Sequence, residues 1–169
     1  MTAEISLDLI KELRERSGAG VMDCKRALQE SGGDLDKALQ YLAELGIASA
    51  EKKASRETAQ GLIESYVHAG RIGAIVEVNC ETDFVARTPE FQSLVHELAM
   101  QIAASNPTVV AEGDLQPEDA TGPASELVLL LQPYIRDQSK TIRDLINEAI
   151  GKTGENIQVR RFARFELGR

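Results

Sequence analysis

The sequence has no tryptophan, only two cysteines and only two histidines among its 169 residues. Aromatic residues make up 4% of the chain, so its hydrophobic core must be built mainly from aliphatic side chains. Cys24 and Cys80 stand alone, without the paired spacing of a zinc site or of a disulfide framework. They are therefore predicted to be reduced packing residues in a cytosol-like compartment.

A basic excess is missing as well. The net charge is −8, which argues against a general nucleic-acid binder. The longest apolar run, Leu127 to Leu131, is far too short to cross a bilayer, and the N-terminus has neither the basic nor the apolar segment of a secretory signal. We expect a cytoplasmic protein, or one of an organelle stroma or matrix if the chain is a processed one. No membrane partner and no direct nucleic-acid partner are expected.

No motif of catalysis or metal binding stands out. Gly151-Lys152-Thr153 matches the end of a phosphate-binding loop, but Ile146 occupies the place of that loop's first glycine. The tripeptide also ends a predicted helix, so a helix C-terminus is the better interpretation. His68 and His96 have no partner at triad or zinc-ligand spacing. The sequence therefore predicts a protein that is not an enzyme and needs no cofactor or metal.

Residues 1–46 are predicted to form three short helices. Their apolar residues recur at helical spacing, and the predicted helices end at Ser17–Gly20, at Gly32-Gly33 and at Gly46. Three short amphipathic helices bury their apolar faces best by packing together, which predicts a compact three-helix module. Residues 47–60 are polar and rich in alanine, and are assigned to a connecting helix or linker.

Residues 61–169 are predicted to form an α+β core. Leu62–His68 and Ile72–Cys80, joined by a short turn, indicate a β-hairpin. A helix follows Thr88-Pro89, and another is capped by Ser139 or Thr141. Residues 106–122 are predicted to be a loop, 124–132 a short helix, and 157–167 a strand. The predicted fold class is α+β, with a three-stranded antiparallel sheet and helices packed on one face.

The last predicted strand is locally basic and carries an aromatic residue. Its alternation places Phe162 outward, beside Arg160 and Arg164. An RNA-binding surface made of Arg160, Arg161 and Arg164 is one interpretation, and a solvated sheet face is the simpler one. An exposed Phe162 would instead indicate a protein interface.

Two connecting segments are not explained by periodicity. The first carries Val21 and Met22 at its tip between two predicted helices, where they could bind a partner or pack into the core. The second, after the hairpin, carries Asp83 beside Phe84. Phe84 could protrude as a wedge, or pack inward against the start of the next helix. The residues alone leave both pairs of alternatives open.

Three stretches of the chain resemble the elongation factor Ts family. They are Leu9–Leu28, with its Gly-Ala-Gly-Val-Met segment, Val76–Ala86, with its Thr-Asp-Phe-Val-Ala segment, and Gly154–Phe162. The resemblance therefore runs from end to end of the chain. It implies that the N-terminal helices form a ubiquitin-associated-type module, and that the function is guanine nucleotide exchange in translation.

The resemblance also implies a partner and contact residues. The partner would be elongation factor Tu, in its GDP-bound and nucleotide-free forms, with Val21 and Met22 on its GTPase domain. A second contact would enter beside the nucleotide and disturb its Mg²⁺ and phosphate site; it would consist of Thr82, Asp83, Phe84 and Val85.

The length of the chain suggests a second copy as a further partner. Longer members carry two copies of the core, and short members are expected to form a homodimer, here non-covalent and involving Phe162 and its neighbours. The alternative function is a peptide-binding adaptor that uses the three-helix module.

Overall fold

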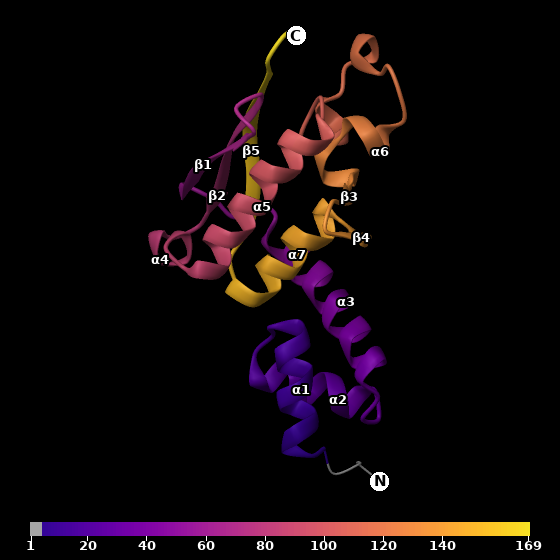
Figure 1. The fold of residues 1–169 in the computed structure, drawn as a ribbon. Helices are drawn as coiled ribbons and strands as arrows, with labels where there is room; N and C mark the ends of the chain where they lie inside the picture. The colour runs from indigo at the N-terminus through magenta and orange to yellow at the C-terminus, as the bar shows by residue number, and fades with distance from the viewer. Residues whose placement is uncertain (1–4) are drawn as a thin grey trace.

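The structure, a computed structural model, describes residues 5–169. The chain forms two parts, each with its own hydrophobic core, joined through one long helix, α3 (Figure 1). The smaller part contains the N-terminal helices. The larger part is an α+β core with a three-stranded sheet, so the predicted fold class is confirmed at this level.

The N-terminal part consists of α1 (Leu7–Ser17), α2 (Val21–Glu30) and the first half of α3 (Leu35–Lys53). The Ser6 hydroxyl accepts a bond from the Leu9 N–H, and the Asp34 carboxylate caps α3. The buried side chains that the three helices share are those of Ile10, Leu13, Cys24, Ala27, Leu28 and Ala38. The three helices are therefore present as predicted, whereas their likeness to a ubiquitin-associated fold stays a prediction.

The third helix does not end at Gly46, and this prediction was wrong. α3 continues to Lys53 and includes the first half of the predicted linker. Gly46 is buried where α3 meets α7 (Ile142–Thr153), and a Cβ on it would lie 3.3 Å from the carbonyl oxygen of Asn147. A glycine in the middle of a helix permits close approach of a second helix. Here Gly46 serves packing rather than helix termination.

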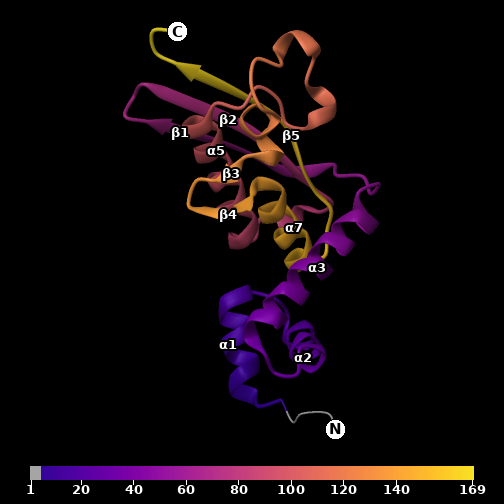
Figure 2. The ribbon, with the colours of Figure 1, turned by 90° about the vertical axis from the view of Figure 1, so that its right-hand side faces the viewer.

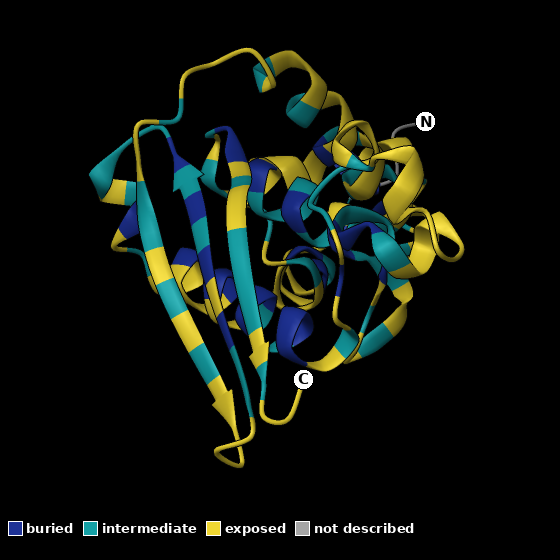
Figure 3. Ribbon diagram, turned by 90° about the horizontal axis from the view of Figure 1, so that it is seen from above, coloured by how far each residue is buried: buried dark blue, intermediate teal, exposed yellow. Residues whose placement is uncertain are grey.

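The larger part is built on an antiparallel sheet with the strand order β1-β2-β5. Its strands are β1 (Gln60–His68), β2 (Ile72–Cys80) and β5 (Ile157–Glu166). The predicted hairpin is therefore confirmed. The helices α5 (Pro89–Ser105) and α7 lie on one face of the sheet (Figure 3), where the alternate residues of β2 are buried: Ala74, Val76, Val78 and Cys80.

A β-bulge in β5 reverses the predicted alternation of that strand. The register against β2 shifts between Glu77 and Val78, which leaves Arg160 without a partner. Phe162 is consequently on the inner face and packs, partly buried, against the core, whereas Phe165 is 73% exposed. The prediction of an outward Phe162 was wrong, because one extra residue moves all later side chains to the opposite face.

Short elements complete the chain. The segment from 106 to 132 lies at the end of the molecule away from α1 and α2 (Figure 2) and contains η1 (Glu112–Asp114), η2 (Pro117–Asp119), α6 (Ala124–Leu127) and η3 (Leu129–Leu131). A small hairpin that the sequence did not predict, β3 (Pro133–Tyr134) and β4 (Asp137–Thr141), leads into α7. Thr141 is the cap of α7, in a capping box with Asp144. Within residues 5–169 no helix combines the length and the apolar character that crossing a bilayer would require.

Candidate partner-binding site

Phe84 lies on a single helical turn, α4 (Asp83–Ala86), between β2 and α5. Its side chain is 82% exposed, whereas Val85 is partly buried against the core and Ala86 is buried. Neighbouring residues of a helical turn point in different directions, so the two inward residues anchor the turn while Phe84 points into solvent. The alternative in which Phe84 packs inward is wrong.

Two consecutive caps determine the path of the chain around Phe84. The hydroxyl of Thr82 accepts a bond from the Val85 N–H at 3.4 Å, and the hydroxyl of Thr88 accepts one from the Phe91 N–H at 3.3 Å at the start of α5. Asp83 forms an ion pair with the exposed Arg87, with 3.1 Å between Oδ2 and Nη2. The turn is therefore a short capped helix rather than an irregular loop.

A residue that the sequence did not single out, Glu155, holds the start of this turn. Its Oε2 accepts the backbone N–H groups of Glu81 and Thr82 at 3.1 and 3.0 Å. Its Oε1 accepts the Thr82 hydroxyl at 2.6 Å. Glu155 lies between α7 and β5, so no local pattern connects it with Thr82; only the folded chain brings the two together.

Glu81 forms the reciprocal contact. Its Oε1 accepts the Asn156 N–H at 2.7 Å and a bond from Arg56 Nη1 at 3.4 Å. These two donors, the Asn156 N–H first, hold the pKa of the Glu81 carboxyl below its usual value. The Asn156 side-chain amide in turn donates to the Arg56 carbonyl oxygen at 2.9 Å. The segment after α3, the turn before α4 and the turn before β5 are thereby tied together.

The cysteine that ends β2 is part of the same packing. Cys80 is buried, and its thiol donates to the Thr82 carbonyl oxygen at 3.2 Å. Burial, with the nearby Glu155 charge, raises the pKa of the Cys80 thiol to about 11. A thiol with such a pKa is protonated at neutral pH and is a poor nucleophile. Cys24 is buried and free as well, so both cysteines are packing residues as predicted.

Val21 and Met22 form a second exposed apolar surface. They occupy the first turn of α2 rather than the loop before it, and their side chains are 49% and 69% exposed. A core role for Met22 is therefore wrong. The structure does not bring this surface together with Phe84: α2 belongs to the N-terminal part, whereas α4 lies on the α+β core (Figure 1).

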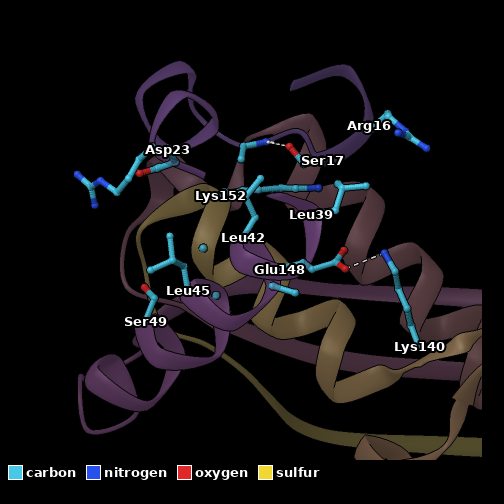
Figure 4. A pocket seen from close by; sticks show the side chains of 15 residues that line it. Arg16, Ser17, Asp23, Leu39, Leu42, Leu45, Ser49, Lys140, Glu148 and Lys152 are labelled. Carbon is cyan, nitrogen blue, oxygen red and sulfur yellow. Dashed lines mark hydrogen bonds and ion pairs between the residues drawn. The ribbon is translucent and has the colours of Figure 1, made fainter. Parts of the chain in front are cut away.

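A pocket of about 450 Å³ lies where the N-terminal helices meet α7 (Figure 4). Leu39 and Leu42 line it from α3, and Lys152 from α7. Glu148, also on α7, is engaged with Lys140 at 2.7 Å. Across residues 5–169 there is no group of His, Cys, Asp and Glu side chains suited to holding a metal ion. The pocket therefore marks the junction between the two parts of the chain.

Comparison with known proteins agrees with the geometry. The family model described as "Elongation factor TS" matches residues 37–122. Elongation factor Ts of Rippkaea orientalis is 50% identical over 98% of this chain and 79% of its own length. Elongation factor Ts of Coprothermobacter proteolyticus is 50% identical over 98% of this chain and 99% of its own. The chain belongs to the elongation factor Ts family.

Membership of the elongation factor Ts family places the chain among the elongation factors of protein biosynthesis. The family match contains Thr82–Val85 and the two caps around them. The alignment with the Synechocystis elongation factor Ts spans 197 positions, more than the 169 residues of this chain, so that relative carries residues that are missing here.

The basic side chains of β5 do not form one free surface on this elongation factor Ts fold. Arg160 and Arg161 both approach Glu77, at 3.9 and 2.7 Å. The bulge turns Arg164 toward the core side, where its side chain is 12% exposed and donates to the Ala103 carbonyl oxygen at 3.1 Å. The arrangement therefore gives no support to the RNA-binding interpretation.

Proposed function

We propose that this protein promotes the release of GDP from elongation factor Tu, and that Phe84 is the wedge that does so. The exposure of Phe84 carries the proposal, because a large aromatic side chain held in solvent by an anchored turn is typical of a protein-binding surface. The caps and the Glu155 bonds support it, since they keep the side chain in one place before the partner arrives.

The proposed mechanism acts on the groups that retain the nucleotide. Tight GDP binding depends on Mg²⁺ at the β-phosphate and on backbone N–H groups around the phosphates. Insertion of Phe84 beside that site would displace these elements of the partner and weaken both interactions. Asp83, which neighbours Phe84 and carries the charge at the start of α4, would orient the turn on the partner, while Thr82 and Val85 hold it in shape.

The expected free-energy contributions favour Phe84 over Asp83 as the main source of the acceleration. A thousandfold acceleration of release requires about 4 kcal/mol of barrier lowering. Burial of a phenylalanine side chain contributes about 1.5–3 kcal/mol, whereas an exposed ion pair contributes about 0–1 kcal/mol. Phe84 should therefore supply most of the effect. By linkage, a protein that weakens nucleotide binding to elongation factor Tu is itself bound more weakly once nucleotide is present. Returning nucleotide therefore displaces it, and no covalent step is needed for turnover.

Val21 and Met22 would supply a second contact, with the GTPase domain of elongation factor Tu. Their apolar side chains are exposed on the first turn of α2, and a contact far from the wedge can add affinity without taking part in release. Met22→Ala should therefore raise the concentration needed for half-maximal exchange more than it lowers the maximal rate.

Stopped-flow release of a fluorescent GDP analogue from elongation factor Tu tests the proposal. The parent protein should accelerate release, and Phe84→Ala should lower the maximal rate by at least about tenfold, because it removes most of the apolar contact. Ile135→Ala is the control, since it removes an exposed apolar side chain between β3 and β4 that belongs to none of the proposed contact surfaces.

A parent protein that leaves the release rate unchanged when present in excess would contradict the exchange function. A peptide-binding adaptor that uses Val21 and Met22 would then be the better interpretation. In that case Met22→Ala should weaken partner binding, while Phe84→Ala should leave it intact.

We further propose a non-covalent homodimer that forms through the outer face of the sheet. Directly paired residues share a face, which places Val67, Gly73 and Phe165 in one row and Ser65, Ile75 and Ala163 in the next. The large apolar side chains of these rows are exposed. Because Gly73 has no side chain, the space between Val67 and Phe165 can receive an apolar side chain of a second copy. Phe165 thus takes the role first predicted for Phe162.

A further inference from the structure

We propose that Glu155 is a positioning residue of nucleotide exchange: its carboxylate keeps the turn before α4 in the conformation that presents Phe84. This inference rests on the proposed function. Glu155 does not lie on α4, and its contacts run to the backbone and hydroxyl of the two residues that precede the helix. It therefore acts through Thr82 rather than on the partner.

The carboxylate satisfies donors that the sheet leaves free. The last pair between β1 and β2 is Gln60 with Cys80, and Cys80 is also the last residue of β2 that pairs with β5. The N–H groups of Glu81 and Thr82 thus lie beyond the ladder, and both are directed to Glu155 Oε2. Bonds from backbone N–H groups to a charged oxygen are stronger than bonds to a neutral one. One side chain therefore determines the direction in which the chain leaves β2.

The second oxygen of Glu155 sets the cap of α4. The Thr82 hydroxyl has one proton and two lone pairs, and it donates the proton to Glu155 Oε1 at 2.6 Å. A lone pair is then directed at the Val85 N–H, from which the same hydroxyl accepts at 3.4 Å. Without Glu155 the hydroxyl is free to rotate. Loss of the carboxylate should therefore loosen the helical turn that carries Phe84.

The contact is reciprocal and this makes it rigid. Glu155 binds the N–H groups of Glu81 and Thr82, while Glu81 binds the N–H group of Asn156 at 2.7 Å. Two adjacent residues on each turn are thus engaged with the opposite turn. Glu155 lies two residues beyond the end of α7, and α7 packs against α3 at Gly46, so the turn before α4 is tied to the helix that carries the N-terminal part.

This arrangement predicts a specific kinetic defect. If Phe84 is presented in only a fraction of the molecules bound to the partner, the maximal release rate falls to that fraction of the parental rate. The concentration for half-maximal release should change little, because Val21 and Met22 are untouched. A variant that is merely partly unfolded behaves differently, because a higher protein concentration restores its full rate.

The test compares Glu155→Ala, Glu155→Gln and, as a control, Glu148→Ala, which removes a carboxylate from α7 that is paired with Lys140. Amide hydrogen exchange of Glu81 and Thr82, measured by NMR on the free protein, reports the contact directly. We expect exchange of these two amides to rise at least about tenfold in Glu155→Ala, and the maximal GDP release rate to fall by about tenfold. Glu155→Gln keeps one oxygen acceptor and should be intermediate, and the control should match the parent.

Parental amide protection, or a parental maximal release rate in Glu155→Ala, would overturn the role of Glu155. So would a loss of rate that excess protein restores. If the parent protein does not accelerate GDP release from elongation factor Tu, the proposed exchange function is wrong; if Phe84→Ala accelerates release as much as the parent does, the wedge role of Phe84 is wrong, and in both cases so is the role of Glu155 in exchange. A failure of the Glu155 role alone is distinguishable, because it requires an active parent protein and a Phe84→Ala variant with a lowered maximal rate.

Discussion

Phe84 and Val85 are adjacent in the sequence and have opposite environments. Val85 packs against the core beside Ala86, and Phe84 is exposed, although by size alone the phenylalanine would gain more from burial. The difference follows from the position of the Thr82 cap, which sets the orientation of the turn, and from Glu155, which holds that cap. The packing of Val85 and Ala86 and the bonds of Glu155 thus act together on the turn that presents Phe84.

The lowered pKa of Glu81 predicts a loss of stability in acid. Its folded-state pKa lies below its ordinary value of 4.5, because the Asn156 N–H and then Arg56 favour the charged form. Between these two pKa values the unfolded chain binds more protons at Glu81 than the folded chain does. The stabilising contribution of the Glu81 charge is therefore fully present above about pH 4.5 and is lost as the pH falls through the folded-state pKa. In urea titrations, Glu81→Gln should lower the unfolding midpoint at pH 7, and the difference from the parent should shrink at pH 3.

Glu118→Gln serves as the control for this titration, because Glu118 is exposed on η2. It should follow the parent at every pH. A Glu81→Gln deficit that is as large at pH 3 as at pH 7 would show that the side-chain charge does not carry the effect.

At the scale of elements, the packing of α3 on α7 decides how the two parts of the chain are joined. A Cβ on Gly46 would meet the Asn147 carbonyl oxygen at 3.3 Å, and a Cβ on Gly151 would lie 3.5 Å from the Gly46 Cα. Two glycines thus let the helix backbones approach each other closely. Because α3 also supplies Leu39 and Leu42 to the N-terminal core, this contact orients that core on the α+β part.

Substitution at Gly46 tests the importance of this contact. Gly46→Ala should be close to neutral, since a gain in helix propensity of about 1 kcal/mol offsets a tight but small contact. Gly46→Leu should reduce the free energy of unfolding by about 1–3 kcal/mol, because its longer side chain must separate the helices. Urea denaturation measures the change. Ala48→Leu, on an exposed position of α3, should stay within about 0.5 kcal/mol of the parent.

At the scale of the whole molecule, the two exposed surfaces proposed to contact the partner belong to different parts of the chain. Met22 lies on the N-terminal helices and Phe84 on the α+β core, and α3 joins the two (Figure 1). Engagement of one partner at two separate places strengthens binding only if their spacing is maintained. The continuous helix and its contact with α7 provide that spacing. A third apolar surface, the outer face of the sheet, remains available for a second copy.

The mass in solution tests the homodimer. Sedimentation velocity over a concentration series should show twice the mass of the 18.4 kDa chain at high concentration. Phe165→Asp, which places a charge in the outer apolar face on the edge strand β5, should shift the population to the single chain. Phe84→Asp is the control: it replaces an exposed phenylalanine that lies outside this face, and the variant should retain the mass of the parent. A single-chain mass for the parent at every concentration would contradict the dimer.

The sequence by itself determined most of the helices, the three strands of the large sheet, the β1–β2 hairpin, the cap at Thr88 and the family, and it narrowed the cap of α7 to Ser139 or Thr141. These features depend on periodicity, on capping residues and on contiguous motifs, all of which are local along the chain. Thr82–Val85 was identified from the sequence in the same way, but its geometry was not. The two alternatives for Phe84 differ only in what the rest of the molecule places beneath the turn.

The tertiary structure decided the remaining features. The local sequence predicts a helix end at Gly46, whereas α3 continues to Lys53, and the close approach of α7 explains why a glycine is placed there. Strict alternation along β5 predicts that Phe162 points outward. Only the pairing of β5 with β2 reveals the bulge at Arg160 that turns Phe162 inward. Glu155 has no local signature, because its partners Glu81 and Thr82 are distant along the chain. Periodicity describes one element at a time, whereas these three residues derive their roles from contact between elements.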